Sequence, residues 1–411
     1  MKTIIQINSF DSGSTGNIAK QINSEANKKG YNTYFIFGRY WKKKYKLPSN
    51  QLKIGNIFDS FIHLLIGRLF DSVGLGSIYS TKKLINAINK LKPSIIHLHN
   101  IHGYYINYPL LFKYLYKKKI PVVWTLHDCW SFTGHCSHFD FNQCTQWKEG
   151  CIKCSHIKEY PKSFYIDRSS KNFKLKEKYF TLISQQLTII PVSYWLESLL
   201  KESFFKNSAI QVIHNGIDLN IFMPSPSKYI LEKYKLQNKI SILGVASPWS
   251  KRKGLDDFIK LRHLLSDKYT IILVGLTQKQ ITKLPKGIIG IERTQDVNEL
   301  VKIYSTVDIF INTTYEDNYP TVNLEAIACG TPVITYNTGG CSESINNNIG
   351  CIVEQGNIQK IIEAINIFSQ KDRNQLRNSC RNHAIQNFSK ELCYNNYIEL
   401  YENILSQNNN N

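Results

Sequence analysis

Short apolar runs alternate with longer amphipathic stretches almost from one end of the chain to the other. The runs are rich in Ile, Val and Leu, and Gly, Asn or Pro commonly bound them, which is typical of buried strands. The amphipathic stretches between them predict helices. The expected strands are 3–7, 33–37, 94–98, 122–126, 188–192 and 210–213 in the first half, and 240–245, 270–274, 287–291, 308–312, 332–336 and 351–354 in the second.

This alternation predicts an α/β fold with two parallel sheets, each covered by helices on both faces. We expect two doubly wound, Rossmann-like domains that face each other across a cleft. The predicted boundaries are 1–205, 206–385 and, for a C-terminal helix with a frayed tail, 386–411. Ligands of open parallel sheets bind beyond the carboxyl ends of the strands, so candidate chemistry is sought there.

The segment 314–343 is the most informative part of the chain. An acidic loop runs into a short apolar helix that carries one carboxylate, Glu325, and the unit closes with Gly339 and Gly340 after a further strand. A helix N-terminus offers N–H groups to an anion, and a carboxylate one turn further in can accept hydrogen bonds from a ribose diol. An ordinary loop–helix–strand repeat is the alternative, and by itself the segment favours neither.

Three other strand ends carry candidate chemistry. Arg252 and Lys253 lie between the strand 240–245 and a helix expected to begin near Leu255, which suits a diphosphate. The small residues from Gly13 to Gly16 follow the first strand and can approach a phosphate closely, although a plain tight turn fits as well. His127 ends the strand 122–126 and is a candidate for the site, unless its neighbour Asp128 merely caps it.

The formal net charge is +20, from 51 Lys and Arg against 31 Asp and Glu. Such an excess predicts an anionic partner, and an anionic membrane surface fits better than nucleic acid because no RNA-binding or helix-turn-helix pattern is present. The stretch 57–70 is apolar on more than one helical stripe and could enter a membrane, but a core helix is the simpler interpretation. No secretion signal or membrane span is expected, so we predict a cytoplasmic protein, peripheral on the inner face of the membrane.

Four of the ten cysteines are closely spaced, in a loop-rich insertion at 129–156. The last pair has the spacing of a metal knuckle, and stable disulfides are not expected in the cytoplasm. A structural zinc site is the sharper hypothesis, with His135, His138 and His156 as spare ligands, and packed free thiols are the alternative. The candidate zinc ligands are Cys136, Cys144, Cys151 and Cys154.

Several motifs together resemble the family-4 retaining glycosyltransferases of GT-B architecture, over nearly the whole chain. They are GSTGNIA, HNGID, ASPWSKRKGLDDF, EDNYPTVNLEAIACGTPVI and GGCSE. The segment that begins HLHNIHGYYINYPLL resembles a narrower subgroup found in bacterial capsule, O-antigen and exopolysaccharide (colanic-acid-like) clusters.

The resemblance implies a nucleotide-diphosphate sugar held mainly by the second domain. Arg252 and Lys253 would contact the diphosphate, Glu325 the ribose, and His127 the donor sugar. The remaining donor-binding residues would be Gly13, Gly16, Glu316, Thr321 and Val322.

The family's two carboxylates have seven residues between them. Asp317 and Glu325 meet that spacing, and Glu316 lies one position too early, so we take Asp317 as the first carboxylate and as catalytic together with His127 and Lys253. One departure is Ser247, near the place where many relatives carry an arginine. The chain has no D-x-D pair, so we expect no cofactor for catalysis, and cations and helix ends of the protein would neutralise the phosphates.

The expected function is transfer of a sugar to a glycan or lipid-linked acceptor. A GT-B nucleotide-sugar epimerase is the second hypothesis, and a basic, zinc-containing nucleic-acid-binding protein is the third. The residues do not identify the base, the sugar, the acceptor, the linkage or the oligomeric state.

Overall fold

The computed structural model describes residues 2–40 and 46–409, which form two compact units. Unit 1 comprises the chain up to His214 together with the chain from Tyr394 onward, and unit 2 runs from Asn215 to Cys393. The division therefore falls after His214, where the sequence analysis placed it after residue 205. The end of the chain, which the sequence analysis set apart, contributes its last helix to unit 1.

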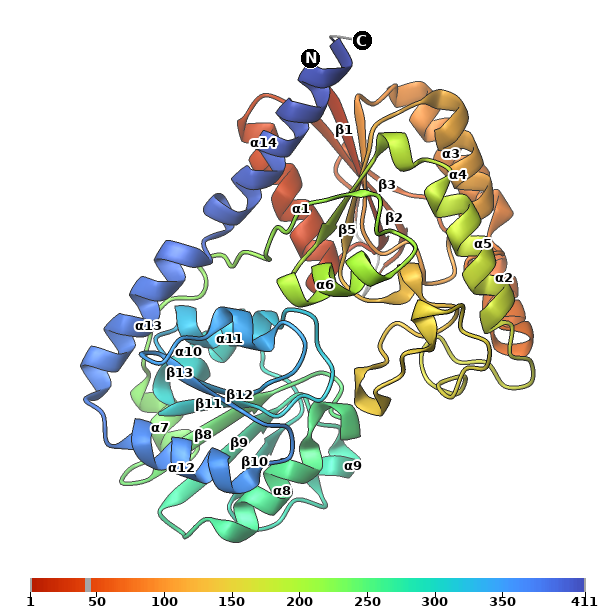
Figure 1. Ribbon diagram of the computed structural model, residues 1–411. Coiled ribbons are helices and arrows are strands. Elements are labelled where there is room, and N and C mark those ends of the chain that lie inside the picture. Colours follow the sequence, from red (N-terminus) through yellow and green to blue (C-terminus); the bar gives the residue numbers. More distant parts are fainter. Residues whose placement is uncertain (1, 41–45, 410–411) are drawn as a thin grey trace. The chain divides into compact units, whose positions relative to one another are not determined.

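Unit 1 is built on a parallel sheet of seven strands in the order β3-β2-β1-β4-β5-β6-β7. The strands are β1 (Thr3–Phe10), β2 (Asn32–Arg39), β3 (Gln51–Lys53), β4 (Ile95–Leu98), β5 (Val122–Leu126), β6 (Leu187–Pro191) and β7 (Ala209–Ile210). Its helices are α1 (Gly13–Lys28), α2 (Ile57–Phe70), α3 (Ile78–Leu91), α4 (Tyr108–Lys118), α5 (Ser169–Thr181), α6 (Tyr194–Glu202) and α14 (Lys390–Asn409). Helix α3 contacts α2 and α4, and α4 contacts α5. These four helices form one row in Figure 1.

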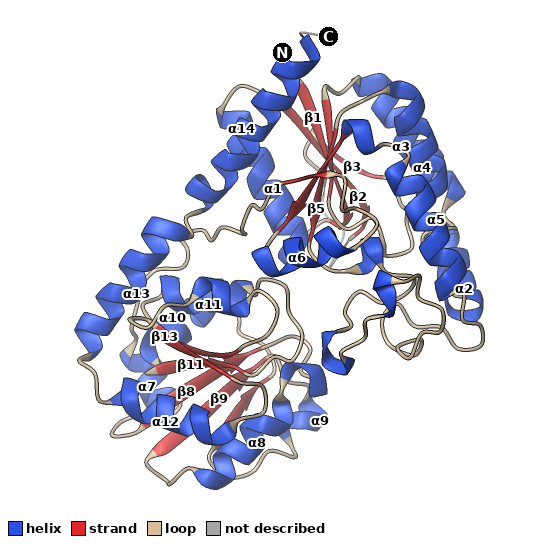
Figure 2. Cartoon of the chain, in the orientation of Figure 1, coloured by secondary structure: helices blue, strands red, loops and turns tan. Residues whose placement is uncertain are grey.

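Unit 2 has a parallel sheet of six strands in the order β10-β9-β8-β11-β12-β13. The strands are β8 (Ile240–Val245), β9 (Tyr269–Val274), β10 (Ile288–Ile291), β11 (Ile309–Asn312), β12 (Val333–Tyr336) and β13 (Gly350–Val353). Its helices are α7 (Lys228–Lys233), α8 (Leu255–Leu264), α9 (Gln278–Ile281), α10 (Val297–Thr306), α11 (Thr321–Ala328), α12 (Ile358–Ser369) and α13 (Arg373–Asn387). Figure 2 shows this sheet between α10 and α11 on one face and α8 and α12 on the other.

The predicted fold class is confirmed: both units are parallel, doubly wound α/β structures. Inner strands such as β5 and β9 are buried throughout, which explains their continuous apolar runs. The short strand β3 was not expected from the sequence.

The interpretation of residues 57–70 as a core helix was wrong. They do form a helix, α2, but only His63 and Gly67 are buried, and Phe58 leaves 80% of its surface exposed. The large apolar side chains at the start of the helix, such as Phe58 and Phe61, point away from the core.

Helix α14 packs on the sheet of unit 1 through buried tyrosines. The Tyr401 hydroxyl accepts a hydrogen bond from Gln6 Nε2 at 3.1 Å and lies 2.6 Å from His97 Nδ1. Tyr397 lies 3.0 Å from the Thr125 hydroxyl. The C-terminal helix is therefore part of the core of unit 1, held there by polar contacts as well as by apolar burial.

Candidate functional site

Two loops meet at the carboxyl ends of the adjacent strands β8 and β11. A 3-10 turn, Lys251–Lys253, follows β8, and the acidic loop follows β11. Gly254 joins them closely: its φ is +72°, and a Cβ there would lie 2.2 Å from the Thr313 carbonyl oxygen. The Tyr315 amide also donates to the Arg252 carbonyl at 2.8 Å. The glycine thus lets the basic and acidic loops touch.

The predicted cations and carboxylates of unit 2 form two ion pairs. Lys253 Nζ lies 2.5 Å from Asp317 Oδ2, and both side chains are about one-fifth to one-quarter exposed (21% and 24%). Arg252 Nε lies 3.6 Å from Glu316 Oε2, and its Nη1 donates to the Glu316 carbonyl at 3.2 Å. Two neighbouring cations and two neighbouring carboxylates, 64 positions apart in the sequence, thus share one edge of the sheet.

Helix α11 begins immediately after this loop. Pro320 precedes Thr321, and no side chain caps the helix with a hydrogen bond. The N–H groups of the first turn, which includes Thr321 and Val322, are therefore oriented as an anion site requires. The helix that the sequence predicts around Glu325 ends at Ala328.

Glu325 lies one turn into α11 and accepts a hydrogen bond from the Tyr304 hydroxyl at 3.1 Å. Burial raises the pKa of Glu325 to about 7, although hydrogen bonds from Tyr304 and Thr321 partly offset this. The carboxyl group is therefore half-ionised near neutral pH. Hydrogen-bond donors that approach it would stabilise its charged form. Tyr304 was missed at the sequence level, since nothing in the sequence pairs it with Glu325.

In unit 1, His127 follows β5 as predicted and belongs to a buried polar chain. Its Nε2 lies 3.0 Å from His99 Nδ1, and His99 Nε2 lies 2.6 Å from Gln6 Oε1. Since Gln6 Oε1 can only accept, His99 carries its proton on Nε2, and its Nδ1 accepts from His127 Nε2–H. Burial lowers the pKa of His127 to about 4, so the ring is neutral at pH 7 and its Nδ1 is a hydrogen-bond acceptor.

The carboxylate of Asp128 interacts mainly with other groups than the ring of His127. Its Oδ2 lies 2.8 Å from His102 Nε2, and its Oδ1 accepts from the Trp130 amide at 2.9 Å. Burial would raise the pKa of Asp128, but His102 and these hydrogen bonds outweigh it and bring the pKa to about 2. Asp128 therefore orders the loop after β5, on which His127 is placed.

The small residues after β1 are the first turn of a helix, not a loop that precedes one. Helix α1 begins at Gly13, and Ser12 makes no side-chain cap. A Cβ at Gly16 would lie 2.9 Å from the Phe10 carbonyl oxygen, so only glycine allows this packing. Gly13 and Gly16 thus lie at the carboxyl end of β1, where the prediction placed them.

The clustered cysteines of unit 1 are all free thiols. The Cys136 thiol donates to Cys154, and this hydrogen bond is the main reason that the pKa of Cys136 is raised. The Gly134 amide donates to Cys151 Sγ at 3.1 Å, and His135 Nδ1 lies 2.5 Å from Asp71 Oδ1. In residues 2–40 and 46–409, no group of three or more Cys, His, Asp or Glu side chains is placed to hold a metal ion.

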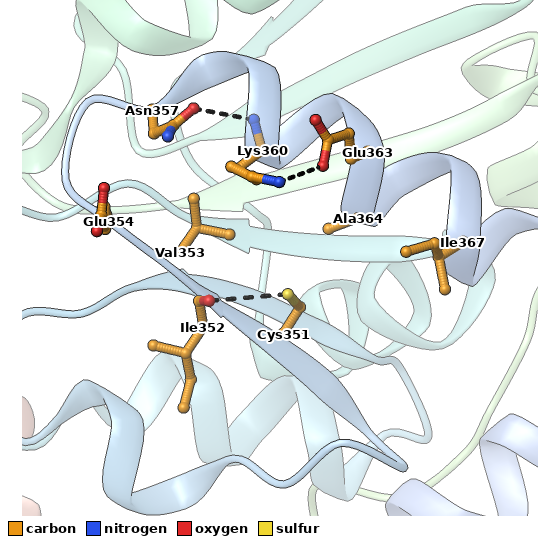
Figure 3. A pocket seen from close by; sticks show the side chains of 9 residues that line it. All are labelled: Cys351, Ile352, Val353, Glu354, Asn357, Lys360, Glu363, Ala364 and Ile367. Atoms are coloured by element: carbon orange, nitrogen blue, oxygen red, sulfur yellow. Dashed lines mark hydrogen bonds and ion pairs between the residues drawn. The ribbon is translucent and has the colours of Figure 1, made fainter.

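A separate hollow of about 410 Å³ lies in unit 2 between β13 and α12 (Figure 3). Its cation, Lys360, pairs with Glu363 at 2.8 Å on the same helix, and Cys351 and Ile352 line the strand side. None of the residues predicted for the site lines this hollow. The predicted residues, and not this hollow, therefore define the candidate site.

Comparisons with known proteins agree with this geometry. The family model described as Glycosyltransferase Family 4 matches residues 32–221, and the model described as Glycosyl transferases group 1 matches residues 228–387. The chain is 22% identical to a putative colanic acid biosynthesis glycosyl transferase, WcaC, of Escherichia coli, over 85% of this chain and 87% of the relative. It is 25% identical to an N,N'-diacetylbacillosaminyl-diphospho-undecaprenol alpha-1,3-N-acetylgalactosaminyltransferase of Campylobacter jejuni, over 59% of this chain and 68% of the relative.

Solved structures share the fold at low identity. Anabaena HepE in complex with UDP has a TM-score of 0.66 and 17% identity, and it covers 98% of this chain and 100% of its own. Sucrose-phosphate synthase from Thermosynechococcus elongatus has a TM-score of 0.70 and 14% identity, with coverage of 99% and 100%. With two family models that match consecutive parts of the chain and GT-B neighbours along its whole length, the chain belongs to the family-4 glycosyltransferases of GT-B architecture.

Proposed function

We propose that this glycosyltransferase moves a sugar, with retention of its anomeric configuration, from a nucleotide-diphosphate sugar to a glycan or lipid-linked acceptor in bacterial surface polysaccharide synthesis. The names of the relatives support the pathway class: colanic acid biosynthesis for one, capsular polysaccharide biosynthesis for another, and a diphospho-undecaprenol acceptor for a third. A structural neighbour bound to UDP and glucose supports the donor class.

The observation that carries the proposal is the edge of unit 2. Arg252 and Lys253 pair with carboxylates there. The start of α11, which no side chain caps, follows the same loop, and Glu325 lies one turn into that helix. The diphosphate of the donor carries two negative charges, as many as Glu316 and Asp317 together, and a third develops as it leaves, so the two cations stabilise the leaving diphosphate most strongly. The carboxylates, once displaced, can accept hydrogen bonds from sugar hydroxyls, and Glu325 can accept from the ribose.

The chemistry follows from this exchange of partners. The bond between the anomeric carbon and the phosphate oxygen breaks, and the acceptor oxygen bonds to the same carbon on the same face. The acceptor proton passes to the departing phosphate oxygen, so no separate protein base is needed. Lys253, Arg252 and the α11 N-terminus stabilise the negative charge that grows on the leaving diphosphate, which is the main contribution of the protein.

His127 supports this scheme as an acceptor of hydrogen bonds. In the tautomer fixed by His99, Nδ1 can receive a hydroxyl hydrogen of the donor sugar. Asp317 is our choice for the carboxylate that contacts the sugar, because its side chain is 24% exposed whereas that of Glu316 is 6% exposed. This arrangement needs no catalytic metal.

We also propose a structural zinc ion in the cysteine-rich insertion. Cys136 is hydrogen-bonded to Cys154, and the charges of Cys154 and Cys144 would raise the pKa of Cys151. These interactions indicate that the four thiols lie in one region. Against it stands the finding that the described side chains hold no preformed metal group. Metal analysis of the purified protein, with one zinc per chain expected, tests it; a metal-free protein with four titratable thiols would refute it.

We place the enzyme at the inner face of the cytoplasmic membrane, with no nucleic-acid partner. The net charge of +20 supports an anionic surface. No helix in the described part of the chain is long and apolar enough to cross a membrane.

The test of the function is incubation with a panel of nucleotide-diphosphate sugars, with and without membrane extract as the acceptor source. Sugar transfer only with the extract, and an unchanged anomeric configuration by NMR, are expected. Epimerised nucleotide sugar without acceptor would favour the epimerase instead. Tight, steeply salt-dependent binding of oligonucleotides would favour the nucleic-acid hypothesis.

A further inference from the structure

Helix α2 of unit 1 carries an unusually apolar exposed face. Ile57, Phe58, Phe61 and Ile62 are 73%, 80%, 57% and 59% exposed, and Leu65 is 42% exposed. The helix has 14 residues, so it is about 21 Å long, and these side chains occupy its first two turns and more. Exposed apolar surfaces of this extent mark interaction sites.

The apolar surface continues beyond α2 at both ends. Near its start, Asp59 accepts hydrogen bonds from the backbone and side chain of Ser80, which brings the exposed Tyr79 of α3 alongside. Near its end, the Phe164 amide donates to the Arg68 carbonyl at 2.8 Å, and Phe164 and Tyr165 are 53% and 80% exposed. Three separate segments of the chain thus build one surface.

Basic side chains lie beside this surface. Arg68 and Lys162 both lie over the Phe164 ring, at 5.7 Å and 5.3 Å from its centre. Asp59, the only acidic residue in the sequence of α2, is hydrogen-bonded to Ser80. A surface of apolar side chains with a basic rim is complementary to an anionic bilayer, in which acyl chains lie below phosphate groups.

A pocket of about 240 Å³ opens beside the first turns of α2, at the carboxyl ends of β2 and β3. Arg39 and Lys53 supply its cations, and Ile57, Phe61 and Leu64 supply its apolar wall. Two of its lining residues carry a buried polar atom with no hydrogen-bond partner among the described residues, namely Arg39 Nε and Ser60 Oγ. A guanidinium N–H and a hydroxyl are the donors that a phosphate oxygen requires.

We propose that unit 1 docks on an anionic phospholipid bilayer through α2, and that the Arg39 pocket takes the phosphate of one lipid. This inference gives a specific surface to the membrane location of the proposed function, but it stands on unit 1 alone. The phosphate would sit at the mouth of the pocket, while Phe58, Phe61 and Ile62 enter the region of the acyl chains. Docking of this kind would hold the enzyme where a lipid-linked acceptor is presented.

The test is co-sedimentation of the purified protein with vesicles of phosphatidylglycerol and phosphatidylcholine, and with vesicles of phosphatidylcholine alone. We expect binding to the mixed vesicles that F58S/F61S weakens at least about tenfold, since each buried phenyl ring contributes strongly to partition. The matched control L264S/I367S, at positions in unit 2 that are 62% and 57% exposed, leaves the binding unchanged. Equal binding by F58S/F61S would overturn the proposal.

Arg39→Gln and Ser60→Ala probe the pocket. Both are expected to reduce the preference for phosphatidylglycerol, with an unchanged melting temperature as evidence of folding. If inorganic phosphate or glycerol phosphate competes fully and F58S/F61S still binds, the pocket is a site for free phosphate and the bilayer proposal fails. A dimer by light scattering that F58S/F61S converts to monomer would show that a second copy covers this face, which also overturns it.

Nucleotide-sugar binding separates this inference from the proposed function. F58S/F61S should keep the thermal stabilisation given by nucleotide sugars, because the candidate donor site lies in unit 2. Loss of vesicle binding with intact nucleotide-sugar binding supports the docking surface. Vesicle binding by a protein that binds no nucleotide sugar would leave the surface standing and refute the function.

Discussion

Lys253 and Asp317 form an ion pair of 2.5 Å at the edge of the second sheet, although 64 positions separate them in the sequence. The sequence analysis predicts a catalytic role for both residues, and donor binding for Lys253 as well, so the ligand-free protein pairs groups that a bound nucleotide sugar would separate. The pair is partly exposed, and such pairs contribute little to stability. Its value is to hold both side chains in place before the donor arrives.

The first prediction follows from that pair. Lys253→Ala should reduce turnover roughly 10²–10³-fold, since it removes one donor that stabilises the leaving diphosphate. Its melting temperature should stay close to that of the wild type. Steady-state kinetics and thermal denaturation measure the two effects, and Lys251→Ala, in the same turn, is the control. A wild-type rate in Lys253→Ala would show that the donor site is elsewhere.

Glu325 gives a pH dependence. Its pKa is raised to about 7, so the carboxylate that we propose for the ribose hydroxyls is lost as the pH falls below that value. The affinity for a nucleotide-diphosphate sugar should therefore fall below pH 7, by up to about tenfold per unit. Glu325→Gln should bind weakly at every pH with no such slope, and Glu325→Ala should lose turnover to the same extent as Lys253→Ala. Isothermal titration from pH 6 to pH 8.5 distinguishes this from a flat wild-type profile, which would contradict it.

His63 predicts sensitivity to acid. Its Nε2 accepts from the Gly74 amide at 2.8 Å, its Nδ1 lies 2.8 Å from Ser77 Oγ, and burial lowers its pKa to about 4. Between that value and the usual 6.5 the unfolded chain binds a proton that the folded chain does not, so stability falls as the pH drops through this window. Denaturant unfolding at pH 7 and pH 4.5 should show the loss, and His63→Gln should show less of it. The same slope in both proteins would assign the effect to other groups.

Tyr401 joins the last helix to the first sheet. Tyr401→Phe should lower the free energy of unfolding by about 1–3 kcal/mol, because His97 and Gln6 lose their buried partner. Tyr229→Phe, at a position that is 61% exposed, should change it by less than about 0.5 kcal/mol. Denaturant titration of the two variants gives the comparison. Equal stabilities would mean that the hydroxyl of Tyr401 contributes nothing to the fold.

The fold was predictable because buried parallel strands are continuous apolar runs, as in Val122–Leu126. The sequence did not reveal β3, which has only three residues and pairs with β2 alone. The exposure of α2 was also missed, since apolar composition alone suggests burial and a functional surface breaks that rule.

The candidate site was predictable in its residue types but not in its pairings. Spacing placed Glu325 on the helix and Arg252 beside a strand end, while the contacts of Glu325 with Tyr304 and of His127 with His99 depend on which strands become neighbours. Strand order is a long-range property of the sheet, and local sequence does not encode it in readable form.

The most direct test of the account is a crystal structure of the protein with a bound nucleotide-diphosphate sugar. We predict the diphosphate against Arg252, Lys253 and the start of α11, the ribose hydroxyls on Glu325, and the ion pair between Lys253 and Asp317 broken. A diphosphate bound away from these residues, with that ion pair intact, would contradict the account.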